Sequence, residues 1–450
     1  MNSVILVVFI ISLLVLYCLD GRDRVGVSRA TWIVVLWAII YGSRSVTEWF
    51  GQSGDGGVLP ESVDEGSITE ASINLSLLFL GLIVLLRRRI RWKAVLSENG
   101  VLVGFYAFWA LSIFWSDYPI ITFKRLFKDM GTLVMALVVL TDLDPGEAIK
   151  AICTRISLLC IPLSEILIRY FPEWGRAYGG YDKSEVMWVG VATHKNTLGV
   201  LAMVGAVFLL WEFLDSSQKN KPSGSRILFV SRIVVLAMSW HLLWISNSVT
   251  SIICAAIGSA LLLFFQVPWI HQRPWRIEIL GVGIGGAILI LDSLFDLKES
   301  FLQSVGRDPT LTTRTEIWPM LMQLQPNAML GAGFNTFWAG ERLRISYEKF
   351  GGIFQAHNGY LETYLNGGWI GIILLMSVLV AAYLRVRKRY MSGRSESNIR
   401  FAVLVIAIVY NYSEASFNKI GILWLLTVFV VMEYMPQPLT PPIALRAGYR

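Results

Sequence analysis

The chain has 450 residues, of which 55% are hydrophobic and only 16% are charged, against roughly 25% charged residues in ordinary soluble domains. Apolar runs close to the ~20 residues that cross a bilayer recur along its length, so the sequence predicts a polytopic helical membrane protein. The net charge of +7 does not indicate a nucleic-acid partner, because the basic residues lie mostly between the apolar runs, where they set membrane topology.

The first apolar run, residues 3–19, lacks a basic leader and a small-residue cleavage site, and we interpret it as a retained span. The four cysteines lie in apolar runs without a CxxC spacing, which is typical of small buried side chains. Window counting predicts an all-α bundle of about 12–13 transmembrane helices. The predicted spans are 3–19, 30–42, 71–86, 99–115, 129–141, 148–168, 196–214, 227–246, 249–267, 277–293, 367–384, 401–413 and 418–435.

Basic clusters after the first, third, seventh, ninth and eleventh spans fall on one side of this bundle. Positive charge marks the cytoplasm, so the N-terminus is predicted to be outside and the C-terminus inside. The predicted organisation is a transmembrane bundle over residues 1–293, a large outer loop over 294–366, C-terminal spans over 367–435 and a cytoplasmic tail over 436–450.

The interval from Gly306 to Gly371 is the longest polar stretch between apolar runs. It is rich in Trp, Phe, Leu and Gly, a composition that favours a folded segment over a disordered one. We therefore expect it to form the head of an active site that faces water at the membrane surface.

His357 lies in this interval, just before an apolar span. Asn358 and Glu316 are further candidate site residues. With the helix starting near Asn358, His357 would stand at the membrane–water boundary, where an ordinary histidine pKa of ~6.5 allows proton exchange near neutral pH. It can remove a proton from an attacking sugar hydroxyl or bind a phosphate. The alternative is a helix-capping histidine without a catalytic role.

Arg314 lies in TLTTRTEIW, which reads as a helix start with Glu316 in the first turn. Guanidinium groups hold phosphate oxygens through paired donors, and helix N-termini attract anions. Arg307 is a weaker candidate for the same anion. Arg342 and Arg344 are predicted to pair with acidic neighbours on a solvated surface.

Three consecutive residues, His194, Lys195 and Asn196, lie at the outer end of the seventh span. A lysine beside a histidine at a membrane entry is suited to a diphosphate, and the alternative for Lys195 is snorkelling to the interface. Glu414 lies at the outer end of the twelfth span, where an acid near lipid is a functional candidate.

Other cations oppose the usual charge bias across the membrane. Lys124, Arg125 and Lys128 fall on the predicted outer side, which indicates either an anionic ligand or a surface or re-entrant helix with solvated charges. Glu165 and Arg169 are four residues apart in the sixth span and are predicted to pair on one helix face.

Several catalytic signatures are missing from the sequence. The outer loop holds no DxD, and the chain holds no HExxH, His/Cys cluster, GxSxG elbow or Walker loop. Metal-assisted, serine-nucleophile and ATP-driven reactions are therefore disfavoured.

The order of the stretches HKNTLG, GRDPTLTTRTEIW, LGAGFNTFW and AHNGYLETYLNGG resembles the O-antigen ligase and polymerase (Wzy/WaaL) superfamily, and most nearly the exopolysaccharide polymerisation proteins of the ExoQ type. The SEASF stretch at Glu414 fits as well. The resemblance implies a GT-C-like bundle with a large periplasmic loop in the bacterial inner membrane. It implies Arg314 and His357 as essential residues, with Lys195 and Arg307 as further matches, although some members carry an arginine at the position of Lys195.

The resemblance also implies a reaction, namely inverting transfer of a glycan from undecaprenyl diphosphate to an acceptor sugar hydroxyl without metal or other cofactor. Two family functions stay open, a polysaccharide polymerase and a ligase that transfers the glycan to lipid A core or another acceptor. A lipid-linked oligosaccharide transporter is the alternative of another class, and surface rather than mid-span charges disfavour it. The expected partners are the lipid-linked glycan, an acceptor saccharide and membrane lipid, with a chain-length regulator as a further candidate.

Overall fold

The computed structural model describes residues 2–24, 26–51, 67–88, 90–179, 185–218, 225–273, 275–281, 283, 314–350, 355–391 and 396–434. Within them the secondary structure is almost entirely helical. The strand pairing there is an antiparallel hairpin, β1 (Arg176–Gly179) with β2 (Glu185–Trp188). The predicted all-α membrane fold is therefore confirmed.

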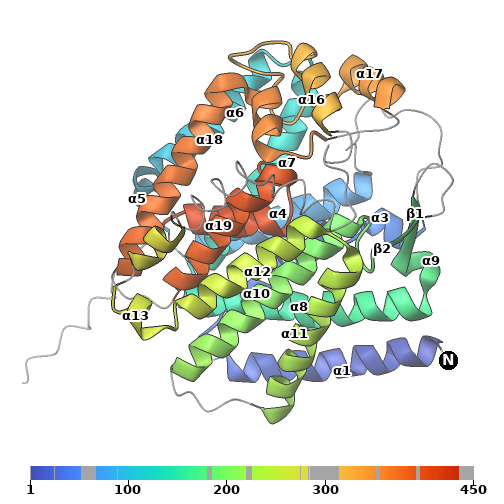
Figure 1. The fold of residues 1–450 in the computed structure, drawn as a ribbon, viewed down its shortest axis with the longest axis vertical. Coiled ribbons are helices and arrows are strands. Elements are labelled where there is room, and N and C mark those ends of the chain that lie inside the picture. The colour runs from blue at the N-terminus through green and yellow to red at the C-terminus, as the bar shows by residue number, and fades with distance from the viewer. Residues whose placement is uncertain are drawn as a thin grey trace, which may run out of the picture.

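The helices follow one another through the chain as Figure 1 labels them. The first half contains α1 (Asn2–Asp23), α2 (Thr31–Gly42), α3 (Val46–Trp49), α4 (Ile68–Arg87), α5 (Trp92–Glu98), α6 (Gly100–Leu111), η1 (Ser112–Phe114), α7 (Pro119–Leu140), α8 (Pro145–Tyr170) and α9 (Pro172–Gly175). The second half contains α10 (Lys195–Gln218), α11 (Arg226–Ser246), α12 (Val249–Phe264), α13 (Pro268–His271), α16 (Arg314–Gln323), α17 (Gly340–Phe350), α18 (Gly359–Met391), α19 (Ser397–Ser413) and α20 (Ile422–Val431).

Six of the described helices are long and apolar enough to cross a membrane, and the bent pair α5–α6 would make a seventh. Four shorter apolar helices, α2, α12, α19 and α20, accompany them. Each predicted span coincides with one of these helices or with α7, except the span 277–293. Residues 282 and 284–293 of that span lie outside the described residues, as do 294–313 and 351–354 of the predicted large loop and the whole predicted tail, 436–450.

The predicted span 129–141 is the second half of a longer helix. α7 begins at Pro119, a residue well suited to a first helical position, and continues to Leu140 without a break. Arg125 and its basic neighbours therefore lie on a continuous helix, and the re-entrant alternative is wrong. Lys128 lies over the ring of Tyr41, with its Nζ 5.3 Å from the ring centre.

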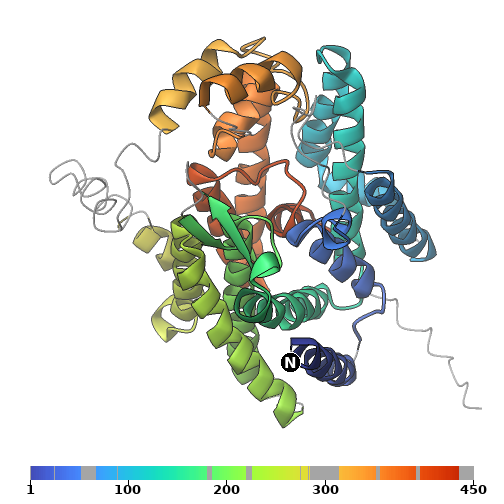
Figure 2. The same ribbon diagram turned by 90° about the vertical axis from the view of Figure 1, so that its right-hand side faces the viewer.

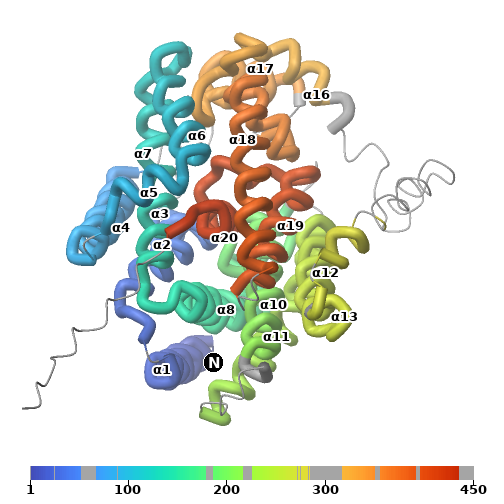
Figure 3. Tube along the Cα trace, turned by 90° about the vertical axis from the view of Figure 1, so that its left-hand side faces the viewer, coloured from blue at the N-terminus to red at the C-terminus, as the bar shows by residue number. Residues whose placement is uncertain are grey.

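The centre of the bundle is α20, in which every residue is buried. Figure 3 shows it enclosed by α2, α7, α10, α18 and α19, and each of these helices contacts it. A buried carboxylate, Asp129 of α7, joins three helices there. It accepts hydrogen bonds from Trp424 Nε1 at 3.1 Å and Tyr106 Oη at 2.9 Å, so the polar group is satisfied inside the apolar core.

α16, α17 and the first part of α18 form a head at one end of the bundle (Figure 2). Where described, it is folded, as predicted, around a second small core made by Ile317, Leu321, Ala332, Phe337, Trp338, Ala356 and Leu365. α18 breaks at Gly368, which has φ +60°. The 328–333 loop then hydrogen-bonds to the broken helix, for example from Gly333 N to Asn366 O at 2.9 Å and from Trp369 N to Ala328 O at 2.9 Å.

Ion pairs fill the opposite end of the bundle. Asp20 bonds Arg24 and Arg155, each at 2.9 Å. Arg24 also bonds Glu212 at 2.5 Å, and Lys150 pairs with Asp215. We call Asp20, Arg24, Lys150, Arg155, Glu212, Asp215 and Arg232 the closed ion-pair cluster, because six of these seven side chains are almost fully buried.

Candidate active site

Two helices begin beside one carboxylate at the head end of the bundle. Glu414 follows the last residue of α19, as predicted from its place at the end of a span. Its Oε1 accepts from Asn196 Nδ2 at 2.8 Å, in the first turn of α10. Its backbone oxygen accepts from Gly359 N at 2.9 Å, at the first residue of α18. The positive ends of two helix dipoles therefore converge on this point.

His357 is held next to Glu414 by an unusual backbone. Its φ of +49° lies in the left-handed region, which a non-glycine residue enters at a cost and which is common at functional sites. Its Nδ1 lies 3.2 Å from Glu414 Oε2 and 3.2 Å from Gln355 Nε2. The chain is thus bent to bring the imidazole to the carboxylate.

The helix cap is Asn358, not His357. Asn358 Oδ1 accepts from the backbone nitrogens of Tyr360 at 3.0 Å and Leu361 at 2.9 Å, the usual N-cap arrangement. Its Nδ2 donates to the Tyr412 carbonyl oxygen at 3.0 Å. The capping alternative for His357 is therefore wrong, and Asn358, expected as a site residue, positions the helix start.

The carboxylate contact decides which imidazole nitrogen reacts. A carboxylate accepts hydrogen bonds, so Glu414 favours the His357 tautomer that carries its proton on Nδ1. The amide nitrogen of Gln355 is a donor and favours the opposite tautomer, but the charge-assisted bond to the carboxylate is the stronger of the two. Nε2 is then the nitrogen that can take up a proton. This arrangement, in which an acid orients a histidine, is suited to general-base catalysis.

His194, Lys195 and Asn196 lie together at the start of α10, as predicted, but their roles differ. His194 Nδ1 accepts from Asn196 N at 3.2 Å, which leaves the proton of the neutral ring on Nε2. Burial among its neighbours lowers the pKa of His194, and Lys195 and His357 lower it further against the opposing charge of Glu414. His194 is therefore suited to donate a hydrogen bond rather than to act as a fixed cation.

Lys419 also joins the site, and the sequence analysis missed it. Its Nζ donates to Gln355 Oε1 at 3.3 Å and to Glu362 Oε1 at 3.4 Å. Glu362 is buried and also accepts from Trp338 Nε1 at 2.9 Å. Lys419 follows the twelfth span on the predicted outer side, so its departure from the positive-inside pattern was the signal that could have found it.

Arg125 supports the site from outside it. Its guanidinium donates to the Asn335 carbonyl oxygen in the LGAGFNTFW loop. Asn335 Nδ2 in turn donates to the Asn418 carbonyl oxygen at 2.6 Å, next to Lys419. The structure thus connects Arg125 to the loop, while its predicted contact with a diphosphate stays a prediction.

Arg314 is the first residue of α16, as the sequence predicted for a helix start. The side chains of Arg314 and Glu316, and the whole of Arg307, lie outside the described residues. One turn further along α16, Trp318 Nε1 donates to the Ala356 carbonyl oxygen at 3.0 Å. Since Ala356 precedes His357, this bond holds the beginning of α16 near the imidazole.

Arg342 and Arg344 lie on α17, away from Glu414. Arg344 pairs with Glu341 at 2.5 Å and Glu348 at 2.9 Å, and all three side chains are more than half exposed. Arg342 bonds Asp117 at 2.7 Å, a partner that its sequence neighbours did not indicate. The predicted surface ion pairs are therefore confirmed for Arg344, whereas for Arg342 the prediction is wrong, because its side chain is only 13% exposed and its partner lies far along the chain.

Two comparisons with known proteins find similar sequences. A family model described as O-antigen ligase matches residues 233–376, an interval that contains Arg314 and His357. The chain is also 24% identical to an exopolysaccharide production protein, ExoQ, of Rhizobium meliloti (strain 1021), over 322 residues that cover 69% of this chain and 71% of that protein. Both matches are thus similarities to the O-antigen ligase and polymerase superfamily, and the longer of them is to an ExoQ protein.

Proposed function

We propose that this protein is a polysaccharide polymerase of the bacterial inner membrane. It transfers a growing glycan from undecaprenyl diphosphate to a sugar hydroxyl of a second lipid-linked unit, on the periplasmic face and with inversion at the anomeric carbon. The observation that carries the proposal is the meeting of two helix N-termini, Lys195, His194 and the Glu414–His357 pair at one end of an apolar bundle.

In the reaction, the acceptor oxygen forms a bond to the anomeric carbon of the donor while the bond from that carbon to the diphosphate oxygen breaks. The acceptor proton passes to His357 Nε2, and Glu414 stabilises the imidazolium that results. One attack from the face opposite the leaving group inverts the anomeric centre.

Negative charge grows on the departing diphosphate as its bond to the sugar breaks. Lys195 and the Nε2 proton of His194 supply donors where that charge develops, and the positive ends of the α10 and α18 dipoles favour it. We assign Arg314, at the start of α16, to the same diphosphate, with Arg307 as a further candidate. Cationic side chains then stabilise the leaving group without a metal.

The ligase is the second candidate, because the family model that matches is described as O-antigen ligase. Donor chemistry is common to both functions, and only the acceptor differs. The similarity to an exopolysaccharide production protein over a longer interval favours the polymerase.

The test uses the purified protein with lipid-linked repeat units as the only glycan. Chain growth in that mixture supports the polymerase. Transfer only after a separate acceptor such as lipid A core is added would assign the ligase. Movement of the labelled lipid across vesicles without any elongation would assign a transporter and overturn both.

Arg314→Lys tests the assignment of the diphosphate site. Lysine keeps the charge but loses the paired donors of the guanidinium. We expect loss of polymer with normal membrane insertion, measured as product per milligram of inserted protein. Full activity in Arg314→Lys would remove this residue from the diphosphate site.

A further inference from the structure

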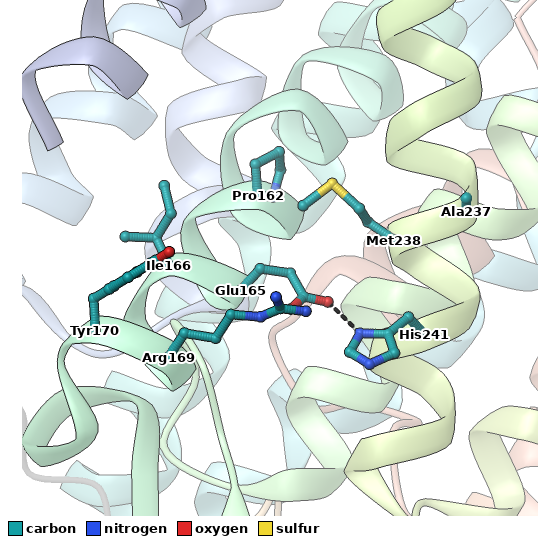
Figure 4. Close-up of a pocket in the computed structure, with 8 residues that line it drawn as sticks. All are labelled: Pro162, Glu165, Ile166, Arg169, Tyr170, Ala237, Met238 and His241. Atoms are coloured by element: carbon teal, nitrogen blue, oxygen red, sulfur yellow. Dashed lines mark hydrogen bonds and ion pairs between the residues drawn. The ribbon is translucent and has the colours of Figure 1, made fainter. Parts of the chain in front are cut away.

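A cavity of about 460 Å³ opens between α8 and α11, apart from the candidate active site. Its apolar walls include Pro162, Ile166 and Met238. Figure 4 shows the Arg169 guanidinium and the His241 imidazole approaching the carboxylate of Glu165 within it. The predicted pair of Glu165 and Arg169 is therefore confirmed, and His241 is an additional member from a second helix.

The cavity lies near the helix ends that lead to the active site. Arg169 is in the last turn of α8, and beyond the end of α11 Thr250 Oγ1 lies 2.7 Å from Ser413 Oγ, beside Glu414. Trp240 and Trp244, on either side of His241 in sequence, are exposed. Exposed tryptophans near a span end are typical of the lipid headgroup region, so we place the cavity at headgroup depth.

The three polar side chains differ in exposure. The Glu165 side chain is 7% exposed, whereas those of His241 and Arg169 are 47% and 63% exposed. His241 Nδ1 lies 2.5 Å from Glu165 Oε1. Glu165 Oε2 accepts no hydrogen bond from the described residues and has only the ion pair to Arg169 Nε at 3.3 Å. A buried carboxylate oxygen of this kind is costly unless a ligand donates to it.

A ligand that fits must carry an acceptor and a donor together. The exposed groups, Arg169 and His241, suit a phosphate, and Glu165 Oε2 suits an ammonium or hydroxyl. The charge of the three side chains is zero, or +1 with a protonated histidine, so a dianionic diphosphate is poorly matched. A zwitterionic headgroup, with one phosphate and one ammonium, matches both the charges and the hydrogen bonds.

We propose that the cavity between α8 and α11 binds the headgroup of an aminophospholipid of the surrounding bilayer. The phosphate contacts Arg169 and His241, and the ammonium donates to Glu165 Oε2. The acyl chains lie along the exposed apolar flank of α11, where Val230, Ile233 and Val234 face outward. This site is separate from the one proposed for the lipid-linked glycan.

The experiment measures lipid retention by the purified, delipidated full chain using native mass spectrometry. The probes are phosphatidylethanolamine, phosphatidylcholine and phosphatidylglycerol with identical acyl chains. We expect phosphatidylethanolamine to be retained about tenfold better than phosphatidylcholine, whose trimethylated ammonium has no N–H to donate to Glu165. This arm compares lipids on the unaltered protein, so it does not depend on the folding of a variant.

Glu165→Gln is expected to abolish the preference, and Glu173→Gln, an exposed acid outside this cavity, is the matched control that keeps it. Equal retention of phosphatidylethanolamine and phosphatidylcholine would overturn the proposal, as would a preference that survives Glu165→Gln. Phosphatidylglycerol retained as well as phosphatidylethanolamine would make this an anionic-lipid site. Displacement of the aminophospholipid by lipid-linked glycan would assign the cavity to the carrier lipid instead.

Discussion

The two ends of α10 gather charged side chains in opposite ways. Near its C-terminal end, Glu212 belongs to the closed ion-pair cluster, where Arg24 and Arg155 contact Asp20 directly. Near its N-terminal end, Glu414 is shared by Asn196 and His357. Similar residue types therefore make a sealed structure at one end and an accessible polar site at the other.

The two ends of α10 differ in the number of carboxylates that pair with the cations there. In the closed ion-pair cluster, four cations meet four carboxylates when Glu147, the second partner of Arg24 and Lys150, is counted with Asp20, Glu212 and Asp215. At the candidate active site, helix N-termini and basic residues surround Glu414 and Glu362. Burial with matched partners stabilises the fold, whereas partly exposed cations beside helix N-termini suit an anionic substrate.

The largest effect is expected at the accessible end, from His357→Ala. Removal of a general base lowers turnover by about 10²–10⁴-fold, while folding changes little because Asn358 caps α18. Polymer formed per unit of folded protein measures this, with Arg344→Ala as the control. Wild-type turnover in His357→Ala would show that the accessible end has no base at this position.

At the sealed end, Arg24→Ala is expected to affect stability instead. The change leaves Asp20 and Glu212 buried without one of their main partners, and removing one member of a buried ion pair costs about 3–5 kcal/mol. The free energy of unfolding in mixed micelles is the measurement. The turnover of the remaining folded protein should stay near that of the wild type. A loss of turnover without a loss of stability would contradict the structural role assigned to the closed ion-pair cluster.

Sequence patterns predicted the residues at the N-terminal end of α10, the candidate active site, better than those of the closed ion-pair cluster at its C-terminal end. His357, Glu414 and Asn196 stand out because each lies at a predicted span end on the outer side, within a recognisable motif, and the structure brings all three together. Arg24 and Arg155 look like ordinary cytoplasmic or mid-span charges, because Glu212, which pairs with Arg24, and Asp20, which pairs with Arg155, come from other helices far along the chain. Only the tertiary packing shows which charges are neutralised.

The positions of helix breaks and the lengths of some helices could not be predicted from the sequence pattern either. The sequence predicts a helix start near Asn358 and a span from residue 367, but it does not show that the helix bends at Gly368, where the 328–333 loop hydrogen-bonds to it. The role of Asp129 as a buried acceptor was not predicted, because a single acid in a mostly apolar helix does not indicate that Tyr106 and Trp424 donate to it. Hydropathy windows register composition, whereas these features depend on contacts between segments.

Glu414→Gln sharpens the comparison within the accessible end. Glu414 is a positioning residue that acts through His357, so we expect a smaller loss than removal of the imidazole, on the order of tenfold to hundredfold in kcat. The KM for the lipid-linked donor should change little, because the cations that hold the diphosphate remain. Glu414→Asp should recover part of the activity. A loss confined to KM would place Glu414 in substrate binding instead.

Gly331→Ala tests the loop that supports the accessible end. Gly331 has φ +67°, and an added Cβ would lie 2.2 Å from the backbone carbon of Asn366. We expect a loss of about 1–3 kcal/mol in the free energy of unfolding. The control is Gly104→Ala in α6, where an added Cβ meets nothing within 4 Å and alanine should be neutral or stabilising. Equal stability of the two variants would mean that the loop is not pressed against α18.

The smallest effect is expected from Arg344→Ala. This arginine contacts two carboxylates at short distances, Glu341 and Glu348. It therefore has about as many ion pairs as a member of the closed ion-pair cluster. Its surroundings differ, because water solvates all three groups and screens their attraction. Melting temperature and turnover should both match the wild type within error. A marked drop in either would show that partner number, rather than burial, separates structural from dispensable charges in this protein.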